Sequence, residues 1–420
     1  MNKIAILPIR SASKRIPGKN FKKFCGIPLY APVLAELVSS ELFDKIVFAV
    51  DAVAQIPNQI CEDPKVLVYQ RSPENSQDMS SSESLMIEVS ETLSIDLSDF
   101  VFLFQATNPF LRRKYLQSAV DQVQTQKFDS IISTIKSRRF SIEEVCKDGF
   151  KRERTQDKKS TALETGVLWA TRFDALKENK SRIGLSPGTI EIDENDDFDI
   201  DTVSDLEFIA EYLENYIAKN QGINKVLKSW FPLEMALLNR QFETRRAMRE
   251  TFSTKTIKSI GRVANVIKGA LVNDGKVVLF GNGGSAADSQ HIAAEFVSRL
   301  KNDRVALPAL ALTTDTSALT AIGNDYGFEF LFERQVQSLV RPQDVVIGIT
   351  TSGRSVNVLK GLAAAREIGA YTVILTGQDA VITECANETL ASASSETAAI
   401  QEIHIQLGHI ICALSEEAYV

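Results

Sequence analysis

The sequence predicts an α/β protein of two doubly wound domains, each built from βαβ units around a parallel sheet. Short apolar runs rich in β-branched residues alternate with helical segments in both halves of the chain, a pattern typical of parallel strands joined by helices. The chain has 420 residues, which is more than one hydrophobic core usually serves, so two domains are expected. We expect them at 1–217 and 218–420.

The first half contains predicted strands separated by predicted helices. The helical segments are 29–41, 82–94 and 112–126. The strands are expected at 3–9, 45–50, 65–69, 100–105, 129–135 and 166–171. Residues 137–165 are charged and irregular, and an acidic segment at 191–205 leads into a last helix over 205–216.

The second half begins with long helical segments and then returns to the alternating pattern. The helical segments are 222–243 and 247–273, and a final helix is expected over 397–417. Predicted strands lie between them at 276–281, 307–312, 344–349 and 371–376.

Composition excludes several classes of protein. The net charge of −7 argues against nucleic acid or an anionic membrane as the main partner. No stretch approaches the roughly 18 apolar residues that a transmembrane helix requires. The five cysteines are scattered without a CxxC spacing, which is typical of free thiols in a reducing compartment. We therefore expect a cytoplasmic protein that acts on small molecules.

Two loops in the second half are suited to a phosphate group. Gly281-Asn282-Gly283-Gly284-Ser285 follows the strand at 276–281, and Thr350-Thr351-Ser352-Gly353-Arg354-Ser355 follows the strand at 344–349. Each loop opens a helix, whose free N–H groups and positive dipole end attract an anion. One such loop could equally be a tight connection, but two in one domain favour a phosphate or phosphosugar ligand.

The three histidines of the chain, His291, His404 and His409, all lie in this half. His291 and Glu295 are spaced i, i+4 and share one face of a helix. Gln401 and His409 lie about 80° apart around the last helix and roughly 12 Å apart along it, which is wide for two ligands of one ion. These four side chains are suitable ligands for a metal such as zinc. For His404 we expect an ordinary solvated or hydrogen-bonded helix residue.

Four segments of this half resemble the phosphoheptose isomerases of the sugar isomerase (SIS) family: GNGGSAADSQHIAAEF, AIGNDYGFEFLF, GITTSGRSVNVLKGLAAAREIGA and IQEIHIQLGHII. The resemblance covers about 220–420 and implies a flavodoxin-like SIS domain that assembles as a homotetramer. It implies zinc ligands at His291, Glu295, Gln401 and His409. It also implies substrate contacts at Asn282, Gly283, Gly284, Ser285, Asn324, Asp325, Thr350, Thr351, Ser352, Ser355 and Gln401.

The implied reaction is an aldose–ketose isomerisation through an enediolate. Such a reaction needs a base beside the carbonyl, a second acid–base group and a cation or donor that stabilises the enediolate. We take Glu295 as the base and His409 as the second group. A non-catalytic sugar-phosphate sensor is the competing interpretation, but a sensor needs the two loops and has no use for the His/Glu/Gln/His set.

The first half contains a basic loop and a set of paired aspartates. Arg10, Lys14, Arg15 and Lys19 lie among small residues directly after the first predicted strand, which suits a polyphosphate. Asp199 and Asp201 alternate in the acidic segment, as carboxylates that hold Mg²⁺ together with substrate phosphates often do. A solvated basic turn and an acidic surface loop are the simpler alternatives.

LPIRSASKRIPGKN, FQATNPF and DIDTVSDLEFIAEYL resemble the acylneuraminate cytidylyltransferases, the CMP-sugar synthetases, over about 1–217. The resemblance implies a Rossmann-like nucleotidyltransferase that uses CTP, with Mg²⁺ at Asp199 and Asp201. Asn108 stands where Ser is usual and Glu164-Thr165-Gly166 replaces a commoner Asn-Gly; both departures lie on the sugar side. The implied nucleotide-site contacts are Arg10, Ser13, Lys14, Lys19, Asn20 and Gln105, of which Gln105 would contact the sugar acid.

Three hypotheses follow for the whole chain. Both domains are enzymes of surface-polysaccharide sugar synthesis, or one is catalytic and the other binds a regulatory sugar phosphate or nucleotide, or the fusion is purely structural or sensing. The third requires a complete metal set and a complete nucleotide loop to be idle, so it ranks last.

Overall fold

The computed structural model divides the chain into two compact units, Met1–Arg240 and Gln241–Val420, and each is described by itself. The residues that it describes are 1–13, 16–24, 26–77, 79–138, 154, 156–380 and 386–419. The division lies 23 residues after the one expected at 217/218. The reason is that Ile223, Leu227 and Trp230 of helix α8 (Gln221–Trp230) are buried in the core of the first unit.

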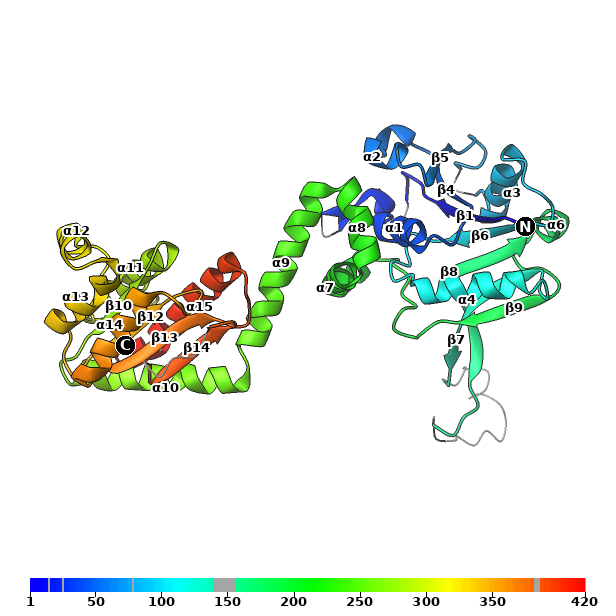
Figure 1. The fold of residues 1–420 in the computed structure, drawn as a ribbon. Coiled ribbons are helices and arrows are strands. Elements are labelled where there is room, and N and C mark those ends of the chain that lie inside the picture. Colours follow the sequence, from blue (N-terminus) through cyan, green and yellow to red (C-terminus); the bar gives the residue numbers. More distant parts are fainter. Residues whose placement is uncertain are drawn as a thin grey trace. The chain divides into compact units, whose positions relative to one another are not determined.

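The first unit has a seven-stranded sheet in the order β5-β4-β1-β6-β8-β7-β9 (Figure 1). The strands are β1 (Lys3–Pro8), β4 (Lys45–Val50), β5 (Val66–Gln70), β6 (Phe100–Phe104), β7 (Ser130–Ser137), β8 (Thr161–Arg172) and β9 (Pro187–Glu191). β8 runs antiparallel to both β6 and β7, so the sheet is mixed, whereas the sequence pattern predicted a parallel one. The other neighbouring pairs are parallel.

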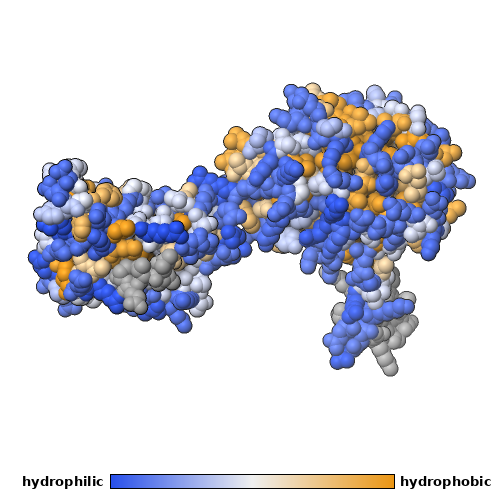
Figure 2. Space-filling view, in the orientation of Figure 1, coloured by the Kyte–Doolittle hydropathy of each residue, from blue (hydrophilic) through white to orange (hydrophobic). Residues whose placement is uncertain are grey.

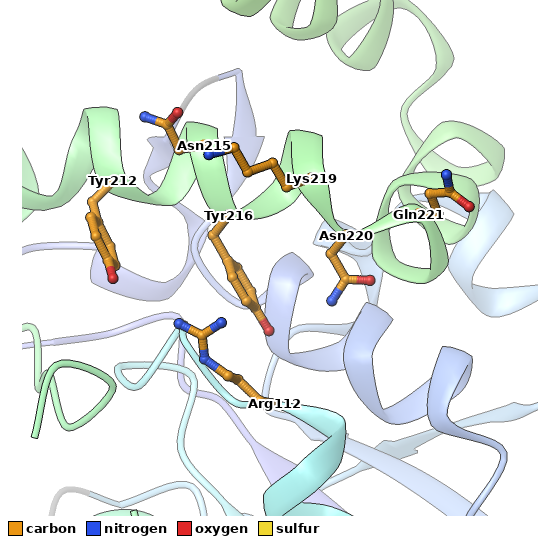
Figure 3. Close-up of a pocket in the computed structure, with 7 residues that line it drawn as sticks. All are labelled: Arg112, Tyr212, Asn215, Tyr216, Lys219, Asn220 and Gln221. Atoms are coloured by element: carbon orange, nitrogen blue, oxygen red, sulfur yellow. The ribbon is translucent and has the colours of Figure 1, made fainter. Parts of the chain in front are cut away.

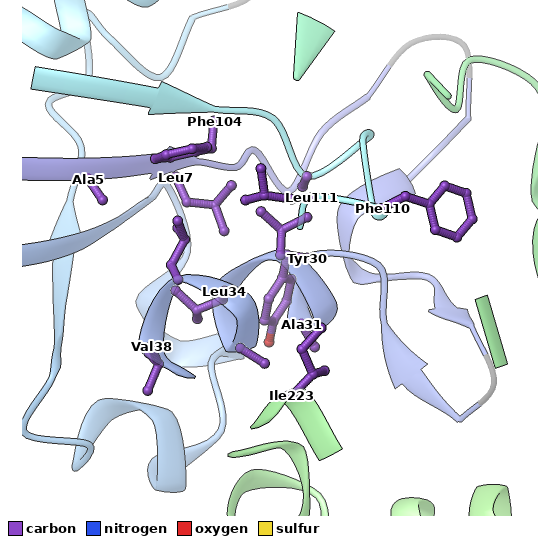
Figure 4. Close-up of a cluster of buried hydrophobic side chains, with 14 of the residues drawn as sticks. Ala5, Leu7, Tyr30, Ala31, Leu34, Val38, Phe104, Phe110, Leu111 and Ile223 are labelled. Atoms are coloured by element: carbon purple, nitrogen blue, oxygen red, sulfur yellow. The ribbon is translucent and has the colours of Figure 1, made fainter. Parts of the chain in front are cut away.

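Two layers of helices cover this sheet. The helices with more than five residues are α1 (Ala31–Ser40), α3 (Ser82–Thr92), α4 (Arg113–Gln124), α6 (Phe173–Asn179), α7 (Val203–Lys219), α8 and α9 (Pro232–Thr251), which crosses from one unit to the next. The apolar side chains of β1 enter the cores on both faces of the sheet, because successive side chains of a strand point to opposite sides. Ala5 and Leu7 enter the core under α1 (Figure 4), and Ile4 and Ile6 enter the core under α3.

The second unit has a fully parallel five-stranded sheet in the order β11-β10-β12-β13-β14. Its strands are β10 (Val277–Gly281), β11 (Ala309–Ala311), β12 (Val345–Ile349), β13 (Tyr371–Gly377) and β14 (Glu388–Ser392). Its helices are α10 (Thr254–Val272), α11 (Gly284–Val297), α12 (Thr316–Asp325), α13 (Leu331–Leu339), α14 (Val356–Ile368) and α15 (Thr397–Glu416). Val277 and Leu279 face one core and Val278 and Phe280 the other, which confirms the doubly wound arrangement.

Local sequence signals explain where the long helices between the sheets begin. Pro232 is the first residue of α9, a position where proline costs nothing because its missing N–H would have no partner there. Ser253 accepts a hydrogen bond from the Thr256 N–H and caps α10. The segments expected at 222–243 and 247–273 are therefore three helices, α8, α9 and α10.

Hydrophilic residues cover much of the visible face of each unit, and apolar residues gather mainly in patches over the first (Figure 2). Among the described helices, none is both long and apolar enough to cross a membrane.

Candidate active sites

A cavity of about 430 Å³ lies at the carboxyl end of β1. β1 has β4 on one side and β6 on the other, which makes its end the topological switch point where open α/β sheets usually bind ligands. Five of the six predicted nucleotide-site residues line the cavity. They are Arg10, Ser13, Lys19, Asn20 and Gln105; Lys14 lies outside the described residues.

The loop after β1 is fastened to its neighbours by specific hydrogen bonds. The Ser11 N–H donates to the Asp51 carboxylate at 2.8 Å, and the Asn20 amide donates to the Arg10 carbonyl at 3.1 Å. Arg10 itself donates to the carbonyl and hydroxyl of Ser80 at 3.0 and 2.8 Å. These bonds fix the backbone of the loop and hold the Arg10 side chain at the cavity.

The Asp199–Asp201 segment lies against the same loop. The Lys19 ammonium donates to the Ile200 carbonyl at 2.6 Å and lies 3.5 Å from the Asp201 carboxylate. Burial and the nearby charge of Asp199 raise the pKa of Asp197. Neighbouring carboxylates beside a basic loop are a donor set that fits Mg²⁺, so the residues present fit the metal that the resemblance implies.

Arg71 is a residue of this cavity that sequence reasoning missed. Its buried guanidinium donates to the Ile9 carbonyl at 3.1 Å and to the Asn75 carbonyl. Burial and the charge of Arg10 lower its pKa to about 10, so it still carries a proton at neutral pH. A lone arginine after β5 follows no recognisable spacing, and only the adjacency of β5, β4 and β1 brings it to the site.

The two departures from the synthetase pattern lie side by side. The Asn108 amide donates to the Gly166 carbonyl at 3.2 Å, and a Cβ at Gly166 would lie 3.0 Å from the Asn108 amide nitrogen and 3.2 Å from the Gln105 amide oxygen. Gln105, Asn108 and Gly166 therefore form one patch at the edge of the cavity.

A second cavity of the first unit, of about 480 Å³, lies between Arg112 and helix α7 (Figure 3). Arg112 pairs with Asp196, which also accepts from the Tyr115 hydroxyl at 2.6 Å, and the Arg112 guanidinium lies over the Tyr216 ring. Asp196 and Asp193, which pairs with Lys114, are thus held by cations of the 112–114 segment, whereas Asp201 pairs with Lys19 of the loop after β1.

In the second unit, the loop after β10 and the loop after β12 are joined by a reciprocal amide pair. Asn282 and Asn357 each donate to the other at 2.9 Å. Gly283 has φ 56° and ψ −120°, a conformation that strongly favours glycine. Both loops therefore lie at the carboxyl ends of β10 and β12; the sequence placed each loop after its strand, and the sheet order shows that the two strands are neighbours.

The loop after β12 presents several hydroxyl groups. Thr350 and Ser355 share a hydrogen bond of 3.0 Å, and the Ser352 hydroxyl accepts from the Arg354 N–H at 3.2 Å. Thr351 is half-buried and Ser352 is exposed. The remaining predicted contacts, Asn324 and Asp325, end α12 and are exposed; the Asn324 amide donates to Asp325 at 2.8 Å.

His291, Glu295 and His409 bring their ligand atoms within 4.8 Å of one another. The two Nε2 atoms of the histidines are 2.9 Å apart, and the His291 Nε2 lies 3.6 Å from the Glu295 carboxylate. Two ligands of a tetrahedral zinc ion are about 3.4 Å apart when each bond is near 2.0–2.1 Å. The donor types and their spacing thus fit zinc after a small opening of the histidine pair.

Gln401 lies at the other end of α11. Its side-chain amide packs on Gly284 so closely that a Cβ there would overlap it. Gly284 precedes His291 by seven residues, about 10 Å of helix. Gln401 therefore lies beside the GNGGS loop, and His409 lies beside His291. Gln401 and His409 are roughly 12 Å apart along α15 and their neighbours are about 10 Å apart along α11, so the two helices run in the same direction here.

Two further groups near this site behave differently. Burial raises the pKa of Asp288, one turn before His291 on the same face of α11; no spacing in the sequence marks this residue. His404 is buried and its Nε2 lies 3.1 Å from the Thr376 carbonyl. Burial lowers the pKa of His404 to about 4, so it is a neutral core residue; of the two forms expected, the hydrogen-bonded one is found and the solvated one is not.

Comparisons with known proteins match each unit separately. The family described as "Cytidylyltransferase" matches residues 4–227, and the family described as "SIS domain" matches residues 242–377. The phosphoheptose isomerase of Aquifex aeolicus (strain VF5) is 58% identical over 156 residues, 37% of this chain and 82% of that protein. The phosphoheptose isomerase of Solidesulfovibrio magneticus is 49% identical over 43% of this chain and 88% of its own.

Two solved structures are also similar to parts of the chain. The phosphoheptose isomerase GmhA from Neisseria gonorrhoeae is 41% identical, covers 44% of this chain and 98% of its own, and has a TM-score of 0.40. The CMP:2-keto-3-deoxy-manno-octonic acid synthetase complexed with CTP is 14% identical, covers 51% of this chain and 100% of its own, and also has a TM-score of 0.40. By family match and sequence identity, the chain belongs to the cytidylyltransferase family through its first unit and to the phosphoheptose isomerases through its second, and is an enzyme of both classes.

Proposed function

We propose that both units are catalytically active, so that one polypeptide chain catalyses two separate reactions in the synthesis of surface-polysaccharide sugars. The observation that carries this proposal is that each unit brings together, from segments far apart in the sequence, the polar groups that its reaction needs. The first has its basic loop beside Asp199 and Asp201. The second has the group of His291, Glu295 and His409.

In the second unit the proposed reaction converts sedoheptulose 7-phosphate into D-glycero-D-manno-heptose 7-phosphate. The loops after β10 and β12 would hold the phosphate and hydroxyl groups. Glu295 takes a proton from the carbon beside the carbonyl and returns it to the former carbonyl carbon. His409 moves a proton between the two oxygens.

Zinc would be held by His291, Glu295 and His409; Gln401, the fourth expected ligand, lies on Gly284 in this structure and would have to turn towards the group to join it. When bound, it would stabilise the negative charge that develops on the substrate oxygens. A sensor would need only the two loops, so the cluster of His291, Glu295 and His409 favours an enzyme over a regulatory sugar-phosphate module.

In the first unit the proposed reaction is cytidylyl transfer from CTP to a 2-keto-3-deoxy acid sugar. The anomeric hydroxyl gives its proton to solvent as its oxygen forms a bond to the α-phosphorus of CTP, and the bond between that phosphorus and the α–β bridging oxygen breaks and releases pyrophosphate. Arg10, Lys19 and Arg71 would neutralise the phosphates, and Asp199 and Asp201 would hold Mg²⁺ beside them. Positioning and charge neutralisation supply most of the rate enhancement in reactions of this kind.

We further propose a homotetramer assembled through the isomerase unit, as the resemblance implies. Exposed apolar side chains on α12 and after it, such as Tyr326 and Phe328, are compatible with a covering subunit. Light scattering of the purified chain would give the mass directly, and a monomer would contradict this part of the proposal.

A substrate panel tests both reactions. The protein is incubated with CTP and a series of 2-keto-3-deoxy acids, and separately with ketose phosphates of five, six and seven carbons, and products are followed by NMR. We expect pyrophosphate release with one acid and isomerisation of the seven-carbon phosphate. Metal analysis that finds no zinc, together with unchanged turnover in Glu295→Gln, would reject the isomerase mechanism.

A further inference from the structure

A buried ion pair links the two helices that carry the proposed isomerase residues. Arg304, in the segment after α11, donates from Nε to the Glu416 carboxylate at 2.9 Å. The two side chains are 0% and 1% exposed. Neither residue belongs to the loops or to the His291/Glu295/His409 group, and neither was singled out by the sequence analysis.

The Arg304 guanidinium also binds the end of α11. It donates to the Glu295 carbonyl at 2.8 Å, to the Phe296 carbonyl at 2.9 Å and to the Val305 carbonyl at 2.9 Å. A cation at the last carbonyls of a helix is favoured by the helix dipole. The planar fork of arginine can reach all these acceptors at once, which a lysine ammonium cannot do.

Arg304 contacts both helices, α11 and α15, close to the residues proposed for catalysis. On α11 the acceptor is the backbone of Glu295 itself. On α15 the acceptor is Glu416, seven residues after His409, which is about two turns or 10 Å along the same face. Arg304 therefore fixes the position of α11 along the axis of α15. The buried thiol of Cys412, whose pKa burial raises to about 12, stays neutral between them.

The spacing of His291, Glu295 and His409 depends on that register. His291 and His409 come from different helices, and their Nε2 atoms are 2.9 Å apart. A slide of one helix by a single residue moves its side chains about 1.5 Å, which is enough to open the group. Misplacements of about 1 Å can cost on the order of 100-fold in rate.

We propose that Arg304 and Glu416 are positioning residues for the isomerase centre: together they clamp α11 to α15 and hold Glu295 and His409 at metal-binding distance. This inference rests on the proposed function of the second unit. A purely structural role is the alternative, because a buried pair could serve stability alone.

Three variants of the full chain separate these possibilities. Arg304→Met leaves the Glu416 charge buried and unpaired, and is expected to lower thermal stability as well as function. The double variant Arg304→Met/Glu416→Leu removes both charges, and such replacements are often neutral or stabilising. Arg304→Lys keeps the charge but loses the fork. The double variant is decisive because it restores packing without restoring the clamp.

Zinc affinity of the metal-free protein, measured by competition with a chelator, is the first readout. We expect the double variant to unfold at a temperature close to wild type and yet bind zinc at least about tenfold more weakly, as for other residues that support metal ligands. We expect Arg304→Lys to bind zinc more tightly than the double variant but more weakly than wild type. Isomerisation should show a kcat loss of about 10- to 100-fold with a smaller change in KM.

The matched control is Lys276→Met, which breaks the Lys276–Asp344 pair at the amino-terminal end of the same sheet. Asp344 is 1% exposed, so this variant also leaves a buried carboxylate unpaired. We expect lower thermal stability but zinc affinity within about twofold of wild type, since substitutions at independent sites do not couple.

The outcomes are distinguishable. A wild-type chain that binds no zinc would reject the proposed function of the second unit. A wild-type chain that binds zinc, with a double variant of equal affinity and equal kcat, would leave that function standing and reject the clamp. Weak zinc binding by the stable double variant, with the control unaffected, supports both.

Discussion

Gly284 and Gln401 illustrate how much of the site depends on single residues. Gly284 opens α11, and the Gln401 amide from α15 lies directly on its Cα. The sequence predicted both residues to contact substrate, but it could not show that they touch each other, because α11 and α15 are more than a hundred residues apart. His291 and His409 also lie on these two helices, so the sequence could not show that their side chains meet. Arg71 and Arg304 were missed because each acts through neighbours that only the folded sheet supplies.

Gly284→Ala tests this contact. The added methyl would overlap the Gln401 amide, so either the loop or the glutamine must move. We expect kcat/KM for isomerisation to fall at least about tenfold, because displacements of this size weaken reactive positioning. Steady-state kinetics followed by NMR would measure it.

The control is Gly269→Ala in α10, where a Cβ would meet no atom within 4 Å. A glycine-to-alanine change inside a helix usually stabilises by about 1 kcal/mol, so this variant should keep its isomerase rate and unfold slightly later. Wild-type kinetics in Gly284→Ala would argue that Gln401 is not tied to the loop during turnover.

At the scale of elements, periodicity located most strands and helices but not their partners. β8 was recognised only as 166–171, because its first four residues are exposed and lack an apolar pattern. No local signal in its sequence indicates that β8 runs antiparallel to its neighbours; only the pairing in the folded sheet shows this direction. β9 and β14 were not predicted; each has five residues, of which only two are buried. The boundary moved because α8 packs on the first unit, where the Asn220 amide donates to Glu36 of α1 at 3.1 Å.

Glu36 makes that packing sensitive to pH. Its side chain is buried, and burial raises its pKa to about 7, against the opposing effect of the Asn220 hydrogen bond. The folded state thus holds the proton more tightly than the unfolded state, whose pKa is near 4.5. The group has no effect on stability below pH 4.5. As pH rises towards 7 it destabilises the first unit, by up to about 3 kcal/mol at higher pH.

Glu36→Gln removes this penalty and can still accept from Asn220. We expect the variant to be more stable than wild type by about 1–3 kcal/mol at pH 8 and nearly unchanged at pH 4.5. Both tryptophans of the chain, Trp169 and Trp230, lie in the first unit, so urea unfolding followed by tryptophan fluorescence reports on that unit. The exposed Glu41→Gln serves as control, and an equal gain there would refute the assignment to Glu36.

At the scale of the whole molecule, length and pattern predicted two domains correctly, and each unit has its own sheet, its own cores and its own candidate site. What the sequence left open was whether both sites work. The fold now gives each hypothesis a distinct consequence: two independent enzymes should respond to site substitutions one at a time, whereas a catalytic unit regulated by a binding unit should respond to both.

Lys19→Met and Glu295→Gln test this directly. Lys19 lines the cavity at the end of β1 and donates to the Ile200 carbonyl, so under the proposed function its loss should lower CTP-dependent pyrophosphate release by about 10- to 100-fold. Glu295→Gln removes the proposed base and should lower isomerisation by at least about 100-fold. Each variant should keep the other reaction within about twofold of wild type, and the double variant should show both losses unchanged, because effects at independent sites add. A fall in isomerisation caused by Lys19→Met would instead mean that the nucleotide unit regulates the isomerase. That coupling should be reciprocal in binding, so CTP would then also change the affinity for the ketose phosphate, which calorimetry would detect.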